Sequence, residues 1–500
     1  YKSHSPGMKC SLLLAASVTR TASSFSSSRA RLVSTASSSM STLSMGAHGA
    51  GSSNPGVHIS SAFDSGNIAL DESALPLGDK QGPGGSDAVE VRLKIVPDPF
   101  TELEERAHSQ WFHFKCVGAR ASTKFTITNA NGASYPQAWP GTTVCASLDR
   151  ETWFRCVDTT YDQDAGTLSW TLGGTPAVSP TPNGGENAGE NASHGSTVWF
   201  SYFAPYSFER HQDLVGRVAR SPHARHAVLG RTLDGRDIDL LTIGDGETKV
   251  WVIARQHPGE PMAEWFAEGL LERLVCEEDA LAAQLRQSCT FHVVPNMNPD
   301  GSVRGHLRTN AAGANLNREW APTGSYHAPT LERSPEVYHV LEAMDASGVD
   351  LFFDVHGDEE VPLNFMAGME GLPGWGPRLE ALQGALLASY QRANPDMQTK
   401  FAYAPDGPKE ANLAICSNQV AHRFGCLGVT LEQPFKDCAT RPMPGQGWSP
   451  ARAKRLGAAV LEATDHVRPL LRAEGDFWLL GGMDPRDKYV RPLEGTGESR

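Results

Sequence analysis

The sequence predicts an α/β protein with a mixed, largely parallel sheet flanked by helices, preceded by a small antiparallel β-sandwich domain. Two observations support this fold class. Short runs, several of them alternating in polarity and separated by Gly, Asn, Asp and Pro, recur between residues 87 and 170. After residue 207, apolar strand-like runs alternate with amphipathic helix-like segments, an order typical of a largely parallel sheet.

The first of these regions consists of short expected strands. They are AVEVRLKIV from residue 88, WFHFKCVG from 111, KFTITNANG from 124, TVCASL from 143, WFRCV from 153 and LSWTLGG from 168. A segment rich in Gly, Pro and Asn near 173–195 predicts a long exposed loop, and the aromatic run from Ser196 predicts a last strand before the next domain. No catalytic-looking cluster occurs here, so we expect a packing or binding domain.

The second region combines buried-type strands with helices that begin at Pro or Ser-Pro. The expected strands are KVWVIARQ from residue 249, CTFHVVP from 289, VDLFFDVHG from 349 and LGVTLEQP from 427. The expected helices cover 261–274, 334–348, 377–394 and 449–471. We expect Glu264 and Glu268, on the first helix, to be surface charges.

The resulting domain prediction divides the chain into four parts. Residues 1–63 form a leader, 64–206 the β-sandwich domain, 207–475 the α/β domain and 476–500 a tail. The leader contains no Asp or Glu and is rich in Ser, with five Lys or Arg, which is typical of a transit peptide to an organelle. A secretory signal around SLLLAASV and untranslated sequence before Met40 or Met45 are the alternatives. We expect a cytoplasmic protein, or a mitochondrial or plastid one if the leader is a transit peptide.

Composition excludes several classes of function. The net charge of −13 argues against a nucleic-acid partner, which requires a basic face. The chain has no long apolar run, so we expect no membrane span. Its nine cysteines include no CxxC pair and are expected to be mostly reduced, buried thiols. Nothing in the sequence specifies an oligomeric state.

Polar residues follow each of the four strands of the second region. His257 and Glu260 follow the first strand, the motif NPDG the second, His356 the third, and Glu432 ends the fourth. Ligands of parallel sheets bind beyond the carboxyl ends of the strands, so these side chains are expected to meet. His257, Glu260 and His356 together make a two-His, one-Glu set, which suits a catalytic zinc with one open position.

The remaining polar residues suggest the chemistry of such a site. Glu432 ends an apolar strand, where a carboxylate is costly unless it has a partner or a task, and beside a zinc-bound water it would transfer a proton. The segment from 298 to 320 carries Arg304, Arg308 and Arg318, with Asn317 directly before Arg318. Guanidinium groups there would hold a terminal carboxylate and stabilise an oxyanion, unless they are ordinary surface arginines.

Six sequence features occur in a fixed order along the chain. They are HPGE, NPDG, an arginine eight residues after the Asp of NPDG, NLNR, a strand ending in His-Gly and a strand ending in Glu. The ordered set resembles the M14 zinc carboxypeptidases. The leading sandwich and the join YFAPYSFERH are similar to the cytosolic carboxypeptidase branch, and DVHGDEE and LEQPFKD to its bacterial-type members. The resemblance covers about 87–475.

This resemblance implies a carboxypeptidase fold and one Zn²⁺ held by His257, Glu260 and His356. It implies that Glu432 is the general base and acid, that Arg308 polarises the scissile carbonyl, and that Asn317 and Arg318 hold the terminal carboxylate. Tyr403 is the only nearby candidate for the family's substrate-side tyrosine. The implied substrates are the C-termini of peptides or proteins.

The site residues named so far do not specify which C-terminal side chain the substrate carries. Relatives in this branch trim C-terminal or side-chain glutamates, which would require a basic residue such as Arg304, Lys409 or Lys436. Asp358, Glu359 and Glu360 would orient the site, favour basic substrates or face solvent. Two other functions compete: a zinc-dependent deacylase of N-acyl amino acids, and an inactive carboxypeptidase-like binding module, which predicts a missing ligand or base.

Overall fold

The structure, a computed structural model, describes residues 57–71, 89–104, 106–172, 196–322, 328–473 and 491–492. The predicted leader up to residue 56, the predicted loop 173–195 and most of the predicted tail lie outside these ranges. Residues 51–500 group into one compact unit. The boundary between residues 206 and 207 therefore stays a prediction.

The N-terminal β region contains two five-stranded sheets. The first has the order β1 (His58–Ser60), β4 (His113–Ala119), β10 (Ser196–Ser201), β6 (Val144–Ser147) and β7 (Phe154–Cys156). The second has the order β2 (Ala69–Leu70), β3 (Glu90–Lys94), β5 (Lys124–Ile127), β9 (Thr167–Thr171) and β8 (Thr160–Asp162). Strand β1 lies within the last residues of the predicted leader.

Large aromatic side chains fill the core of this region. Phe125 packs against Phe200 with ring centroids 4.6 Å apart, and Trp170 lies within 5.6 Å of both rings. Phe125 belongs to one sheet and Phe200 to the other, so the two sheets share this core. The expected antiparallel sandwich is confirmed with one difference, because β3 and β5 pair in parallel.

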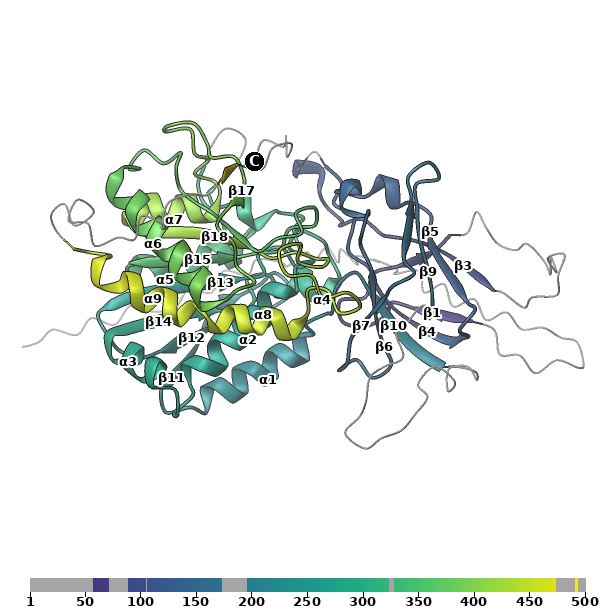
Figure 1. Cartoon of the computed structure of the whole chain (residues 1–500), viewed down its shortest axis with the longest axis horizontal. Helices are drawn as coiled ribbons and strands as arrows, with labels where there is room; N and C mark the ends of the chain where they lie inside the picture. Colours follow the sequence, from purple (N-terminus) through teal and green to yellow (C-terminus); the bar gives the residue numbers. More distant parts are fainter. Residues whose placement is uncertain are drawn as a thin grey trace, which may run out of the picture. The chain divides into compact units, whose positions relative to one another are not determined.

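A seven-stranded mixed sheet forms the second region (Figure 1). Its order is β11 (Ala224–Arg231), β12 (Asp237–Ile243), β14 (Cys289–Val294), β13 (Thr248–Ala254), β15 (Leu351–Val355), β18 (Leu427–Glu432) and β16 (Phe365–Ala367). The four strands β14, β13, β15 and β18 are parallel neighbours, whereas β11, β12 and β16 pair antiparallel at the two edges. A separate pair joins β17 (Phe401–Ala402) and β19 (Arg491–Pro492).

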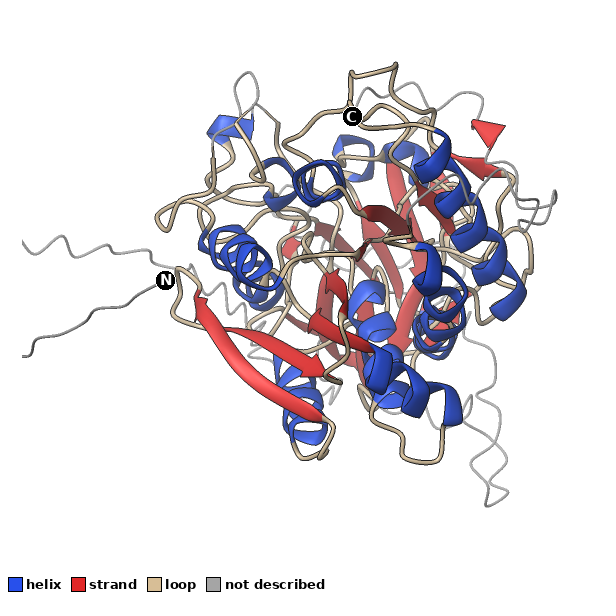
Figure 2. Cartoon of the chain, turned by 90° about the vertical axis from the view of Figure 1, so that its left-hand side faces the viewer, coloured by secondary structure: helices blue, strands red, loops and turns tan. Residues whose placement is uncertain are grey.

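Helices lie on both sides of this sheet (Figure 2). They are α1 (Phe208–Ala219), α2 (Met262–Leu274), α3 (Ala280–Ser288), α4 (Pro299–Arg304), α5 (Pro335–Ser347), α6 (Pro377–Ala393), α7 (Cys416–Phe424), α8 (Pro450–Ala458) and α9 (Val460–Val467). Successive residues of a strand point to opposite faces. On β13, Val250 and Val252 join the core formed with α2, α3, α6, α8 and α9, while Trp251 and Ile253 join the core formed with α5 and α7.

The expected helices and strands of this region are present, but α3, α4, α7 and β16 were not expected, and other segments differ from their predictions. The helix expected over 449–471 is divided at Ala459 into α8 and α9. The segment expected to join the domains forms α1, which Ser207 caps by accepting a hydrogen bond from the Arg210 amide. The hairpin of β11 and β12 was not expected. Within the described ranges, no helix combines the length and apolar character of a membrane span.

Candidate metal centre and substrate cavity

The parallel strands bring distant polar residues to one edge of the sheet. His257 and Glu260 follow β13, and His356 follows β15 on the neighbouring strand. Val355 pairs with Leu431, so His356 and Glu432 are the next residues on two adjacent parallel strands. All four strand ends were expected to meet, and the backbone topology brings together three of them.

His257, Glu260 and His356 face one another closely enough to share a cation. The His257 Nδ1 lies 2.7 Å from Glu260 Oε1, and the His356 Nδ1 lies 2.9 Å from Glu260 Oε2. The two Nδ1 atoms are 3.1 Å apart. In a tetrahedral zinc site with ligands about 2.1 Å from the metal, ligand atoms are about 3.4 Å from each other. The spacing and the donor set fit zinc.

Each histidine is held through its other ring nitrogen. The His356 Nε2 lies 3.0 Å from Asp354 Oδ1, and the His257 Nε2 donates to Asn315 Oδ1 at 3.1 Å. Carboxylate and amide oxygens only accept, so both Nε2 atoms carry the hydrogen and both Nδ1 atoms present lone pairs to a metal. An orienting role was one of three alternatives for Asp358, Glu359 and Glu360, whereas the carboxylate that bonds His356 is Asp354.

The electrostatics of the two histidines differ. Burial, reinforced by the charge of Arg308, lowers the pKa of His257 to about 3, so this ring is neutral at neutral pH. Burial alone would lower the pKa of His356 too, but the carboxylates of Asp354 and Glu260 outweigh it and raise this pKa well above its ordinary value. A metal bound at the His356 Nδ1 would compete with a proton for that atom.

The turn His257-Pro-Gly-Glu260 depends on close packing. A Cβ on Gly259 would lie 2.7 Å from the carbonyl oxygen of Leu307, so this position requires glycine. Arg255 has a positive φ of 60° and is 1% exposed. Its guanidinium donates to the carbonyl oxygen of Pro258 at 3.0 Å and to Glu264 Oε2 at 2.7 Å, which holds the turn from behind.

The prediction that Glu264 and Glu268 are surface charges was wrong. Glu264 is fully buried, and its carboxylate bonds Arg255 and the His211 Nδ1. Glu268 is 1% exposed and pairs with Arg210 at 3.1 Å. The helix containing them is covered by α1 and α8, which the helical periodicity of one segment does not reveal.

The His211→Gln variant is expected to lose stability in a pH-dependent manner. Burial would lower the pKa of His211, but the hydrogen-bonded carboxylates of Asp239 and Glu264 outweigh it and raise this pKa to about 9. A raised pKa adds stability that is complete below the unfolded pKa of about 6.5 and disappears as the pH rises through about 9. The full effect is on the order of 3 kcal/mol.

Urea unfolding of wild type and His211→Gln at pH 6 and pH 10 measures this contribution. The difference in free energy of unfolding between the two proteins should be large at pH 6 and should shrink at pH 10. The exposed His422→Gln serves as the control, for which no such change is expected. A difference for His211→Gln that is equal at both pH values would contradict a charged His211.

A cavity of about 770 Å³ opens over the candidate metal centre. Its walls include the three candidate ligands and Glu432, Arg308, Asn317, Arg318 and Tyr403, which are the residues to which the family resemblance gives a role. Glu432 is 8% exposed at the end of β18. The Asn317 Oδ1 accepts from the Cys416 amide at 2.9 Å, which commits that oxygen to the protein and leaves the amide N–H groups to donate into the cavity.

Tyr403 and the segment after His356 form another wall of the cavity. The Tyr403 hydroxyl donates to Asp358 Oδ2, and its ring packs edge-on against Phe365 at 4.8 Å. Burial raises the pKa of Asp358, and burial followed by the charges of Glu260 and Asp358 raises that of Glu359 well above its ordinary value. Both shifts favour the neutral forms of these carboxyl groups.

Two groups of predicted residues lie elsewhere. The motif NPDG is buried outside the cavity lining: Asn298 caps α4, and the Asp300 carboxylate accepts from Thr232 and Arg236. The basic candidates for a glutamate pocket, Arg304, Lys409 and Lys436, are also absent from the lining. Arg304 pairs with Asp234 at 2.7 Å, and the Lys436 Nζ donates to the carbonyl oxygens of Ala138 and Pro140.

Sequence analysis missed the contribution of the β region to this cavity. Four lining residues precede β6, namely Glu104, Arg106, His108 and Tyr135. It also missed Asn315 and Asp354, the partners of the two histidines. Asn315 and Asn317 both lie within the motif NLNR. Only the fold shows that Asn315 bonds His257.

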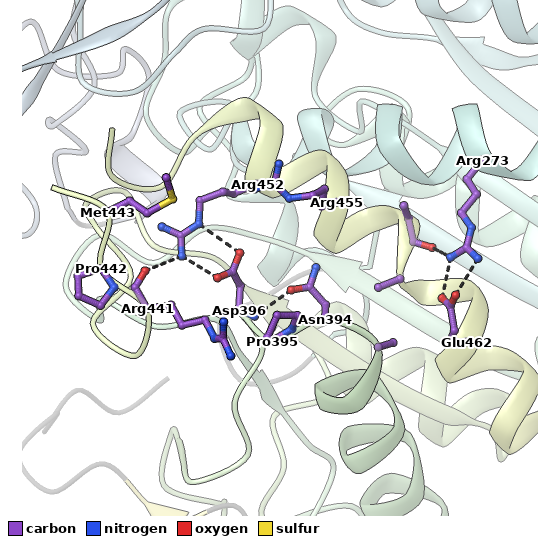
Figure 3. A pocket seen from close by; sticks show the side chains of 13 residues that line it. Arg273, Asn394, Pro395, Asp396, Arg441, Pro442, Met443, Arg452, Arg455 and Glu462 are labelled. Carbon is purple, nitrogen blue, oxygen red and sulfur yellow. Dashed lines mark hydrogen bonds and ion pairs between the residues drawn. The ribbon is translucent and has the colours of Figure 1, made fainter. Parts of the chain in front are cut away.

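A second cavity, of about 630 Å³, lies among α6, α8, α9 and residues 441–443 (Figure 3). Its most buried charges are paired within it, because Arg452 bonds Asp396 and Arg273 bonds Glu462, both at 2.7 Å. Its described lining includes neither histidine nor cysteine. The chemistry that needs metal ligands and a proton acceptor therefore belongs to the first cavity.

Two family models match the chain. The model of the cytosolic carboxypeptidase N-terminal domain matches residues 59–179, and the model of zinc carboxypeptidase matches residues 212–421. An uncharacterized protein of Zymomonas mobilis is 43% identical over 406 residues, which are 80% of this chain and 94% of that protein. Cytosolic carboxypeptidase 4 of Mus musculus is 28% identical over 53% of this chain, and the match spans 26% of that longer protein.

Solved structures resemble the chain over most of its length. A metallo-carboxypeptidase from Pseudomonas aeruginosa, in complex with (2-guanidinoethylmercapto)succinic acid, is 42% identical with a TM-score of 0.70. The match covers 83% of this chain and all of that chain (100%). A metallo-carboxypeptidase from Burkholderia cenocepacia is 41% identical, with the same TM-score of 0.70 and the same coverage of 83% and 100%.

Proposed function

Because the chain belongs to the M14 family of zinc carboxypeptidases, in its cytosolic carboxypeptidase branch, we propose that it removes C-terminal amino acids from peptides or proteins at the cavity over His257, Glu260 and His356. The observation that carries this proposal is the arrangement of those three ligands beside Glu432, Arg308 and Arg318 in one cavity. Both halves of an exopeptidase site, a metal centre and a clamp for a terminal carboxylate, are then available.

The two Nδ1 atoms and the Glu260 carboxylate are the proposed zinc ligands. Zinc bound there would lower the pKa of a coordinated water and polarise the scissile carbonyl. Glu432 takes a proton from the attacking water and delivers it to the leaving amine. The Arg308 guanidinium donates to the carbonyl oxygen as its negative charge grows.

Asn317 and Arg318 are the proposed clamp for the substrate's terminal carboxylate. Their donors fix the distance between the chain end and the bond that is cut, which restricts the enzyme to the last residue. Tyr403 is proposed to contact the substrate from the opposite wall, where its hydroxyl is held by Asp358. The β region and the α/β region are proposed as two domains that divide near residue 206.

The proposal is tested with a peptide library whose members differ in the C-terminal residue. Mass spectrometry before and after addition of a chelator should show chelator-sensitive loss of a single residue. An N-acyl amino acid is the second substrate, because a deacylase would cleave it in preference to the peptides. Release of no terminal residue from any peptide would refute the carboxypeptidase function.

Glutamate is the first proposed side chain at the cleaved position. With Arg308 and Arg318 committed to the carbonyl and the carboxylate, Arg106 is the remaining arginine in the cavity lining. The pKa of Asp358 and that of Glu359 are raised, which reduces repulsion of an acidic side chain. A basic side chain is the alternative, favoured by the acidic composition of this wall and by the guanidino group of the ligand bound to the Pseudomonas aeruginosa relative.

The Arg106→Gln variant distinguishes these two preferences. If Arg106 receives a glutamate side chain, we expect kcat/KM for a C-terminal glutamate to fall by about tenfold, as for loss of one charged contact made by an exposed side chain. For a peptide ending in leucine, kcat/KM of the variant should stay within about twofold of the wild-type value. Competing peptides ending in Glu, Leu or Lys, analysed in one reaction, provide the measurement. Faster release of Lys than Glu by the wild type would favour the acidic wall instead.

A further inference from the structure

We propose that the N-terminal β region is a working part of the active site, because Asp98 and Tyr135 hold Arg308 in its position. The inference rests on the proposed function, in which Arg308 stabilises negative charge on the scissile carbonyl. Asp98 precedes Arg308 by 210 residues in the chain, and Tyr135 precedes it by 173 residues. Both are positioning residues, since they act on Arg308 rather than on the substrate.

Asp98 fixes the backbone that carries Arg308. Its carboxylate is 5% exposed and accepts from the backbone amides of Leu307, Arg308 and Thr309 at 2.7, 2.8 and 2.9 Å. It also accepts from the Thr309 hydroxyl at 3.1 Å. Hydrogen bonds to an ionised acceptor are short and strong, so four of them on one carboxylate define the path of these three residues.

Tyr135 fixes the guanidinium itself. Its hydroxyl accepts a hydrogen bond from Arg308 Nη1 at 3.1 Å. The fully buried Gln110 holds the Tyr135 backbone on both sides, accepting from its amide at 2.9 Å and donating to its carbonyl oxygen at 3.1 Å. The Arg106 guanidinium lies over the ring, 5.2 Å from its centroid. The hydroxyl is therefore presented from a rigid part of the β region.

The nature of this partner matters for catalysis. Two fully buried arginines elsewhere in the protein pair with carboxylates, Arg255 with Glu264 and Arg452 with Asp396. Arg308 forms no ion pair with any residue in the described ranges; its side-chain partner there is the neutral Tyr135 hydroxyl. A neutral acceptor orients the guanidinium without neutralising it, which leaves its charge for a developing oxyanion.

A third contact reaches the other end of the same loop. The Glu104 carboxylate accepts from the Asn315 amide at 3.0 Å, and the Asn315 side chain is the partner of His257. The β region thus holds the segment 307–315 at its start, at the Arg308 side chain and at its end. We therefore expect substitutions of the β-region residues that contact this segment to affect turnover, even though none of these residues is a proposed metal ligand.

The Tyr135→Phe variant tests the inference with little risk to folding. It removes one hydroxyl and keeps the ring. In the full-length, zinc-loaded protein we expect kcat to fall about tenfold with KM within twofold, because the misplaced group acts on the transition state. Zinc content and Tm should not change. Tyr161→Phe, on β8 and outside the cavity lining, is the matched control and should leave kcat unchanged.

Asp98→Asn replaces one acceptor oxygen by a donor that would face backbone amides. We expect a larger loss in kcat, together with a lower Tm. The Tm is measured in parallel, and a variant that fails to fold leaves Tyr135→Phe to decide the question.

A double-mutant cycle with Arg308→Ala gives the decisive readout. If Tyr135 acts through Arg308, adding Tyr135→Phe to Arg308→Ala should cost nothing further in kcat. Independent, multiplicative losses would overturn the inference while leaving the proposed function intact. An Arg308→Ala variant with full activity would instead refute the role of Arg308 in the proposed function, and the inference would fall with it.

Discussion

Glu432→Gln is expected to keep its zinc and to lose about 10³-fold or more in kcat, the range for removal of a general acid and base. Glu432 lies beside His356 on the adjacent parallel strand but outside the ligand set of His257, Glu260 and His356. The amide has the size of the carboxylate and cannot accept the proton of the attacking water. Binding of metal and of substrate should therefore persist while turnover stops.

Peptide hydrolysis and metal analysis on the same purified sample separate the possible roles of Glu432. The exposed Glu278→Gln makes the same chemical change away from the cavity and should behave as wild type. Unchanged turnover in Glu432→Gln would remove this residue from the mechanism. Loss of the metal together with turnover would make Glu432 part of the metal centre rather than the proton carrier.

His257→Ala is expected to abolish stoichiometric zinc binding and all activity. Removal of one of three ligands should weaken zinc binding by more than about 100-fold, because groups that only orient a ligand are already worth 10- to 100-fold. Asp354→Asn provides the graded comparison. Its amide would still occupy the space beside His356 Nε2, and we expect an intermediate loss of zinc affinity with activity restored by excess zinc.

Thermal unfolding with and without added zinc provides a readout that does not depend on activity. Zinc bound only to the folded protein raises Tm, so wild type should respond and His257→Ala should not. His422→Ala, which removes an exposed histidine, should respond as wild type does. A zinc response retained in His257→Ala would place the metal elsewhere.

The architecture could be inferred from local patterns because each element carries its own signal. The strands β13, β14, β15 and β18 are continuous apolar runs, since both faces of the sheet are covered by helices. The element β12 was missed although it is similarly apolar, because its charged flanks, such as Arg236 and Asp237, resemble a surface turn. Helix α7 was also missed; it is only nine residues long.

The candidate ligands could be predicted from sequence for a different reason. A parallel sheet brings all its strand ends to one edge, so residues that directly follow strands become neighbours whatever lies between them. This argument reached His257, Glu260, His356 and Glu432. It failed for NPDG, because the asparagines and aspartate after β14 turn away to cap α4 and to hold the neighbouring loop.

By itself, the sequence determined the fold class and the residues of the candidate metal centre, because strand ends and helix starts are set by residues close together in the chain. Tertiary structure alone decided that Glu264 is buried, that Asp354 and Asn315 hold the histidines, and that Tyr135 reaches Arg308. These contacts join segments whose approach depends on how sheets, helices and the β region pack, and no periodicity in a single segment encodes that packing.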